Sequence, residues 1–292
     1  MALQANESVV SDQQRRQERP LIALKRRQRD WAVDRGHSVD SRGYLERVDA
    51  NLWRDLCETS RCAFEKGSGS ELKGKMRALH SSSALAVNFF EYWTSAAPTA
   101  LKELLELESP VRAIRFEAQH QTGLPGNPPN LDVCLALESG HTIAIESKFT
   151  EWLTRKRVVR GVFKPKYFAA DQEVWSSRGL PACETLATEI QAARHRFLHF
   201  DAVQMLKHAL GLATQLGSRF SLWYVYFDCE CAESDIHKAE INEFAEAVGA
   251  EIRFNTVTYQ ELFRRLQSAG SSVDAQFVDY LGHRYFAPVE TP

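Results

Sequence analysis

Cysteines are few in this 292-residue sequence, and no two of them stand in a CxxC pair. Their scarcity argues against a disulfide framework, and the missing paired spacing argues against a zinc ribbon. We expect reduced thiols with structural roles at all six positions: Cys57, Cys62, Cys134, Cys183, Cys229 and Cys231.

Long hydrophobic runs are also missing. No stretch of about 18 apolar residues is present that could span a bilayer, and the N-terminal segment MALQANESVVSDQQRR lacks the apolar core of a secretory signal. Neither a P-loop nor a dinucleotide-binding glycine fingerprint occurs, which argues against an ATP-driven motor. We therefore expect a soluble, cytoplasmic protein that does not bind membranes.

What is present is the composition of an ordinary globular protein. Hydrophobic residues make up 44% of the chain and charged residues 25%, with a net charge of -2. Such a chain can bury a substantial core. We divide it into a basic N-terminal extension, residues 1–43, and one domain, residues 44–292. The small net charge does not argue against nucleic acid, because local clustering decides where a phosphate backbone binds.

Basic residues gather in two stretches. Residues 11–30 hold seven Lys or Arg against three acids, which indicates a mobile arm or a polar helix. Residues 152–170 hold six against none, mixed with aromatic residues that could stack on bases. Either stretch could instead be an ordinary solvated face. The candidate nucleic-acid-binding residues are Arg155, Lys156, Arg157, Arg160, Lys164, Lys166 and, on a later helix, Lys207.

Hydrophobic periodicity predicts the elements around a central pair of strands. The near-continuous apolar run over 220–228 is typical of a central strand, and residues 113–119 alternate like a strand with one wet face. Helical spacing of apolar residues predicts helices over 43–67, 80–93, 101–108, 184–200, 201–216 and 234–249. Serines at the start of the second of these can cap it. Residues 252–266 read as a last strand followed by a helix.

The stretch 131–149, LDVCLALESGHTIAIESKF, reads as two strands joined by a Ser-Gly turn. Side chains alternate faces along a strand, so Glu146 and Lys148 share one face while the isoleucines and Ser147 take the other. If the turn holds an odd number of residues, such as 139–141, Leu137 pairs with Ile143 and Asp132 lies opposite Lys148. An even turn would send Asp132 to the other face.

Two carboxylates and an ammonium at one end of a sheet suit phosphodiester hydrolysis. Mg²⁺ or Mn²⁺ prefers oxygen ligands, which Asp132, Glu146 and the backbone carbonyl of Ser147 can supply. Lys148 can position the attacking water and stabilise the developing charge. The alternative is a plain salt bridge between Asp132 and Lys148 with Glu146 solvated.

Asp132 followed by Glu146-Ser147-Lys148 on the next strand resembles the motif of the PD-(D/E)xK nuclease superfamily, although Leu131 stands where the motif has proline. The resemblance implies an α/β, restriction-endonuclease-like fold, with a mixed central β-sheet flanked by α-helices. It also implies metal binding by both acids and a catalytic role for Lys148. Many members add an earlier acid, for which Glu117 and Glu91 are the candidates.

Some members of the superfamily also carry a glutamine on the helix after the hairpin, and Gln204 matches it, with Lys207 and His208 one turn later. The resemblance predicts a metal-dependent nuclease that acts on DNA, as an endonuclease rather than an exonuclease, with RNA and a homodimer both left open. The alternatives are a catalytically inactive protein of the same fold that binds nucleic acid or a partner, and a plain structural scaffold.

Other metal-like patterns are weaker. His195 and His199 have the spacing of a chelating pair but lack a third ligand, so we expect a surface or phosphate-contacting pair. Cys229, Cys231 and His237 are too few for a zinc site.

Overall fold

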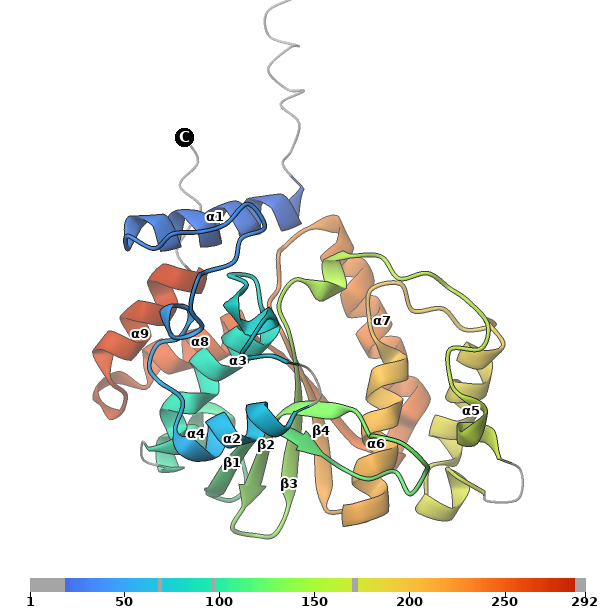
Figure 1. Ribbon diagram of the computed structural model, residues 1–292. Coiled ribbons are helices and arrows are strands. Elements are labelled where there is room, and N and C mark those ends of the chain that lie inside the picture. Colours follow the sequence, from blue (N-terminus) through green and yellow to red (C-terminus); the bar gives the residue numbers. More distant parts are fainter. Residues whose placement is uncertain (1–18, 68–69, 96–97, 170–172, 287–292) are drawn as a thin grey trace, which may run out of the picture.

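A five-stranded sheet forms the centre of the computed structural model, which describes residues 19–67, 70–95, 98–169 and 173–286. Its strands lie in chain order across the sheet (Figure 1). The first three pair antiparallel and the last three parallel, so the sheet is mixed. The strands are β1 (Val111–Gln119), β2 (Asn130–Leu137), β3 (Thr142–Lys148), β4 (Phe220–Tyr226) and β5 (Arg253–Thr258).

Helices cover both faces of this sheet (Figure 1). One hydrophobic cluster includes side chains of α1 (Pro20–Asp34), α2 (Glu58–Lys66), α3 (Ser82–Phe90), α4 (Pro98–Leu104), α8 (Tyr259–Ser268) and α9 (Ala275–Leu281). The opposite cluster includes α5 (Pro181–Gln191), α6 (Ala202–Leu216) and α7 (Ala232–Val248). The predicted mixed α/β architecture is therefore confirmed. Within the described ranges, no helix has both the length and the apolar character that a membrane span requires.

From residue 133 to residue 145, the hairpin of β2 and β3 alternates as predicted. Ile143 and Ile145 enter the first cluster and Ala144 the second, although Leu131 joins the second cluster and not the first. Residues 138–140 form an odd-numbered turn, closed by a hydrogen bond from the Leu137 N–H to the His141 carbonyl (2.9 Å). The predicted register is wrong by two residues, because the turn includes residue 138 and leaves residue 141 paired.

Two predicted helices differ from the structure. The apolar spacing over 45–56 belongs to bridges, turns and a short 3₁₀ segment, and α2 begins only at residue 58. The helix predicted over 184–200 ends at residue 191, and residues 192–200 follow an irregular path that includes Ala193 at a positive φ of 55°. Both segments still bury apolar side chains. Their hydrophobic spacing therefore indicated burial, but not a helical backbone.

Residues 20–34 of the predicted N-terminal extension form α1, and residues 11–18 of its basic stretch lie outside the described ranges. Helix α1 packs against the C-terminal turn Gly282–Phe286, where Arg284 is fully buried. The Arg284 guanidinium lies over the Trp31 ring, donates to the Asn51 carbonyl (2.7 Å) and also contacts the Asn51 side chain. This arginine therefore fastens the two ends of the described chain to one core.

We expect Arg284→Met to lower the free energy of unfolding by about 3 kcal/mol, because the buried Asn51 side-chain oxygen loses its donor and the Asn51 carbonyl keeps only Asn88. The control is Arg264→Met, which removes a surface ion pair to Glu261 and should change stability by less than about 0.5 kcal/mol. Urea denaturation followed by circular dichroism measures both. Equal losses for the two variants would contradict the role of Arg284.

Candidate active site

Three acids lie in a row across β1, β2 and β3. The β1–β2 register places Glu117 opposite Asp132, and the β2–β3 register, continued by one residue, places Asp132 opposite Glu146. Residues opposite each other in neighbouring strands share a face of the sheet. Asp132 therefore lies across from Glu146 and not from Lys148, but the predicted gathering of the two acids and the lysine on one face holds.

Glu117 has an unusual backbone. Its φ is 49°, inside a strand and on a residue with a side chain, which costs of order 1 kcal/mol. Its carboxylate accepts a hydrogen bond from the Asn130 side chain (2.5 Å) and borders the same cavity as Asp132 and Glu146. Such strain is often found where a side chain must be aimed at a functional site.

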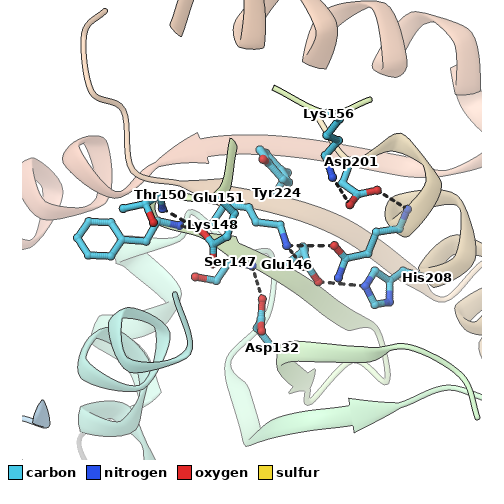
Figure 2. Close-up of polar contacts among 12 residues, drawn as sticks. Asp132, Glu146, Ser147, Lys148, Thr150, Glu151, Lys156, Asp201, His208 and Tyr224 are labelled. Carbon is cyan, nitrogen blue, oxygen red and sulfur yellow. Dashed lines mark hydrogen bonds and ion pairs between the residues drawn. The ribbon is translucent and has the colours of Figure 1, made fainter. Parts of the chain in front are cut away.

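Asp132, Glu146 and Lys148 form the centre of the site (Figure 2). The Ser147 N–H donates to Asp132 Oδ2 (2.7 Å), which fixes the first acid against the strand that carries the second. Lys148 Nζ donates to Glu146 Oε1 (2.5 Å). The Ser147 hydroxyl lies on the opposite face of β3, 2.7 Å from the Tyr259 hydroxyl, so only its backbone can serve the site.

Helix α6 supplies two further contacts (Figure 2). Gln204 Oε1 accepts a hydrogen bond from Lys148 Nζ (3.0 Å), as its position after the hairpin suggested. One turn later, His208 is buried, and its Nε2 lies 3.0 Å from Glu146 Oε2. The i, i+4 spacing of these two residues is visible in the sequence, but the role of His208 as a partner of Glu146 is not. Glu146 is thus contacted at both carboxylate oxygens.

The pKa values of Asp132 and Glu146 are shifted in opposite directions. Burial and the neighbouring charge of Glu146 raise the pKa of Asp132 well above its usual range. Burial would also raise the pKa of Glu146, but the Lys148 charge and the His208 contact hold that pKa below its ordinary value. Burial likewise raises the pKa of Glu117. Burial would lower the pKa of Lys148, yet Glu146 and Asp132 raise it, so Lys148 is a cation.

These residues border one cavity of about 550 Å³. The cavity is lined by Glu117, Asp132, Glu146, Lys148 and Gln204, together with two acids that sequence reasoning missed, Glu71 and Glu151. Glu71 precedes α3, and its carboxylate contacts Lys75 (3.1 Å) and the Ser83 hydroxyl (3.1 Å). It lies 59 residues before the first residue of β2 and follows no recognisable motif, so only the folded chain reveals it.

Glu91, the other candidate for the accessory acid, lies elsewhere. It is buried, and its two carboxylate oxygens accept hydrogen bonds from the Cys57 N–H (2.7 Å) and the Ser60 hydroxyl (2.7 Å). These contacts satisfy the beginning of α2. Of the two candidates, Glu117 is therefore the one that geometry brings to the cavity.

The donor set fits a hard divalent cation. Among the described residues, no three Asp, Glu, His or Cys side chains are grouped closely enough to form a complete metal site. Mg²⁺ commonly uses only one or two protein carboxylates, however, and completes its octahedron with water and substrate phosphate. Asp132 and Glu146 provide that pair. Burial and then the neighbouring charge of Glu146 raise the pKa of Asp132, and a cation would offset that charge.

A family model matches this chain over residues 13–286, and its description is "restriction endonuclease associating with ARP". The match covers nearly the whole sequence. The chain belongs to this family. No curated protein and no solved structure matches it.

In this member of the family, the basic segment 152–169 leaves β3 directly beside the site. Its exposed cations are Arg155, Arg157, Arg160 and Lys164. Lys156 is paired with Asp201, Lys166 contacts the Pro125 carbonyl, and Lys207 lies over the rings of Phe163 and Tyr167.

The aromatic residues of this segment do not serve as a stacking surface. Trp152, Phe163 and Tyr167 are buried in the second hydrophobic cluster, and Phe168 is packed against it. The expectation that they stack on bases is therefore wrong for these buried rings. Their role is to hold the segment on the domain so that its cations face outward.

The two histidines at i, i+4 spacing are separate. His199 is buried, with Nδ1 2.7 Å from the Trp152 carbonyl, so the expected surface pair is wrong for this residue. His195 lies between Glu189 (3.7 Å) and Glu243 (3.2 Å). His237 stacks on Trp152, with ring centroids 4.5 Å apart, and is a core residue.

The contact between His208 and Glu146 can be tested without a ligand. We expect His208→Leu to lower the free energy of unfolding by about 2 kcal/mol, because one oxygen of a buried carboxylate loses its partner. His208→Gln keeps a donor near that position and should recover at least half of the loss. Thermal denaturation of both variants measures this difference. If His208→Gln is no more stable than His208→Leu, His208 stabilises the protein through packing alone.

Proposed function

We propose that this protein is a divalent-metal-dependent nuclease that hydrolyses phosphodiester bonds, with DNA as its substrate. The observation that carries the proposal is the meeting of Asp132, Glu146, Lys148 and Gln204 in one cavity. Membership of a restriction-endonuclease family supports the same activity. A plain salt bridge with a solvated acid does not describe this arrangement, because Glu146 is 2% exposed.

Each residue then has a chemical task. Asp132 and Glu146 would hold Mg²⁺ or Mn²⁺, with the Ser147 carbonyl as a further oxygen ligand. The ion would supply charge neutralisation at the scissile phosphate and activation of water. Lys148 would stabilise the negative charge that develops on the phosphate, and Gln204 orients its ammonium. Glu117, and Glu71 beyond it, would accept hydrogen bonds from water entering the cavity.

The exposed cations of segment 152–169 would bind the phosphate backbone. Arg155, Arg157, Arg160 and Lys164 are free to face a polyanion because their side chains are exposed. Lys156, Lys166 and Lys207 are engaged with the protein and would act mainly by shaping the segment. We also propose an association with ARP, which rests on the family description alone.

The catalytic role of Lys148 is tested by cleavage of plasmid, linear duplex, branched and single-stranded DNA with Mg²⁺, with Mn²⁺ or with EDTA. We expect cleavage only with metal, and a loss of at least about 100-fold in Lys148→Ala. Lys238→Ala is the matched control, because Lys238 pairs with Asp228 on the surface. Binding of DNA without cleavage of any substrate by the wild type would favour the inactive binding protein over the nuclease.

Metal binding is tested separately by thermal stability. Saturating Mg²⁺ or Mn²⁺, at about 100 times its dissociation constant, should stabilise the wild type by about 2.7 kcal/mol. Asp132→Asn should abolish this gain, because a neutral amide is a poor ligand for a hard cation. Asp279→Asn, an exposed aspartate of α9, should retain the gain. Equal stabilisation of all three proteins would place the ion elsewhere.

A further inference from the structure

A second, smaller cavity of about 230 Å³ lies between the basic segment and the chain that leads into α6. Its walls are apolar, formed by Val158, Val159, Phe197 and Phe200 among others, and cations line it as well. Arg157 and Arg196 are the exposed members of that basic lining. Apolar walls with charged groups beside them are typical of a site for a ligand that is flat and apolar in one part and anionic in another.

The segment that forms one wall is held in place. The Lys156 N–H donates to the Leu198 carbonyl (2.6 Å), and the Gly161 N–H donates to the Gln191 carbonyl (3.1 Å). The Phe163 N–H donates to the Gln191 side chain (2.9 Å). Val159 lies between these anchors, yet its side chain is 52% exposed. Val159 therefore lines the cavity with an exposed side chain on a backbone that hydrogen bonds hold in position, so it can contact a ligand there.

A chain of polar contacts runs from Lys156, which lines the cavity, to Lys148 of the candidate active site (Figure 2). Lys156 and Asp201 both line the cavity and form an ion pair. Asp201 Oδ1 accepts the Gln204 N–H (3.0 Å), and Gln204 Oε1 accepts from Lys148 (3.0 Å). Gln204 therefore lies between the lining of this cavity and Lys148.

We propose that this cavity binds the base of a nucleotide near the scissile phosphate, so that the preferred substrate is unpaired at that position. The proposal rests on the proposed nuclease function. Apolar walls would cover the base, the guanidinium groups of Arg157 and Arg196 would contact its face or its phosphate, and Asp201 would accept from its polar edge. In a continuous duplex each base is stacked and paired inside the helix, where this cavity cannot reach it.

Charge and size favour a nucleotide over a segment of a protein. The basic stretch 152–170 contains six Lys or Arg and no acid, which complements a polyanion. A volume of about 230 Å³ is smaller than the 300–1,000 Å³ of ordinary small-molecule sites and suits a single planar base. A stable protein partner would instead need a contact area of roughly 800 Å² on this chain.

The test compares two labelled DNA duplexes that differ only in one unpaired nucleotide, a 2-aminopurine, in the strand under study. Fluorescence anisotropy with EDTA present gives the affinities without cleavage. We expect the wild type to prefer the unpaired duplex about five-fold, and the 2-aminopurine emission to change on binding. Val159→Gln should lose this preference. Val33→Gln, an equally exposed valine of α1, should keep it.

The outcomes separate the two proposals. Equal affinities for both duplexes, or a preference that Val159→Gln retains, would overturn the base-binding cavity even if the wild type cleaves DNA with metal. A preference that Val159→Gln abolishes supports the cavity even if no DNA is cleaved, in which case the nuclease activity alone fails. Thermal denaturation of Val159→Gln, whose substitution is at the surface, verifies that lost preference is not lost folding.

Discussion

The burial of Glu146 is the constraint on which the rest of the site depends. Burial of a carboxylate away from water destabilises the folded state unless charges and hydrogen-bond donors surround the carboxylate. Strand β3 supplies one such group, Lys148, from two residues away. The second, His208, can come only from a separate element, so α6 must lie against the C-terminal end of β3. The position of that helix then fixes Gln204 as well.

The close packing of α6 follows from a residue with no side chain. A Cβ atom at Gly211 would lie 2.4 Å from the His120 carbonyl oxygen, so glycine lets the helix approach the chain that follows β1. At its other end, Asp201 caps α6 and also pairs with Lys156 of the basic segment. Helix α6 therefore joins the acids of the hairpin to the cations beside them.

The centre of the site could be predicted from sequence because strand alternation is robust. An error of two residues in register changed which residue Asp132 faces, but an even shift cannot move it to the other face. What sequence could not predict depends on irregular backbone. Glu71 approaches from a turn, and Glu117 is aimed by a positive φ that alternation alone does not anticipate. The apolar periodicity over 45–56 likewise predicted which side chains are buried, but not that the backbone there is irregular instead of helical.

Acids and cations occupy different depths, and this separation constrains any phosphate-containing ligand. Glu146 is buried at the cavity and Asp132 is half-buried beside it, whereas Arg155 and Arg157 are exposed. A nucleic acid would therefore contact the exposed cations first. Lys148 is engaged with Glu146, so its charge already offsets one acid. If the protein is the proposed nuclease, a divalent ion beside Asp132 would supply further positive charge for the approach of a phosphate, so the ion and the substrate would bind together.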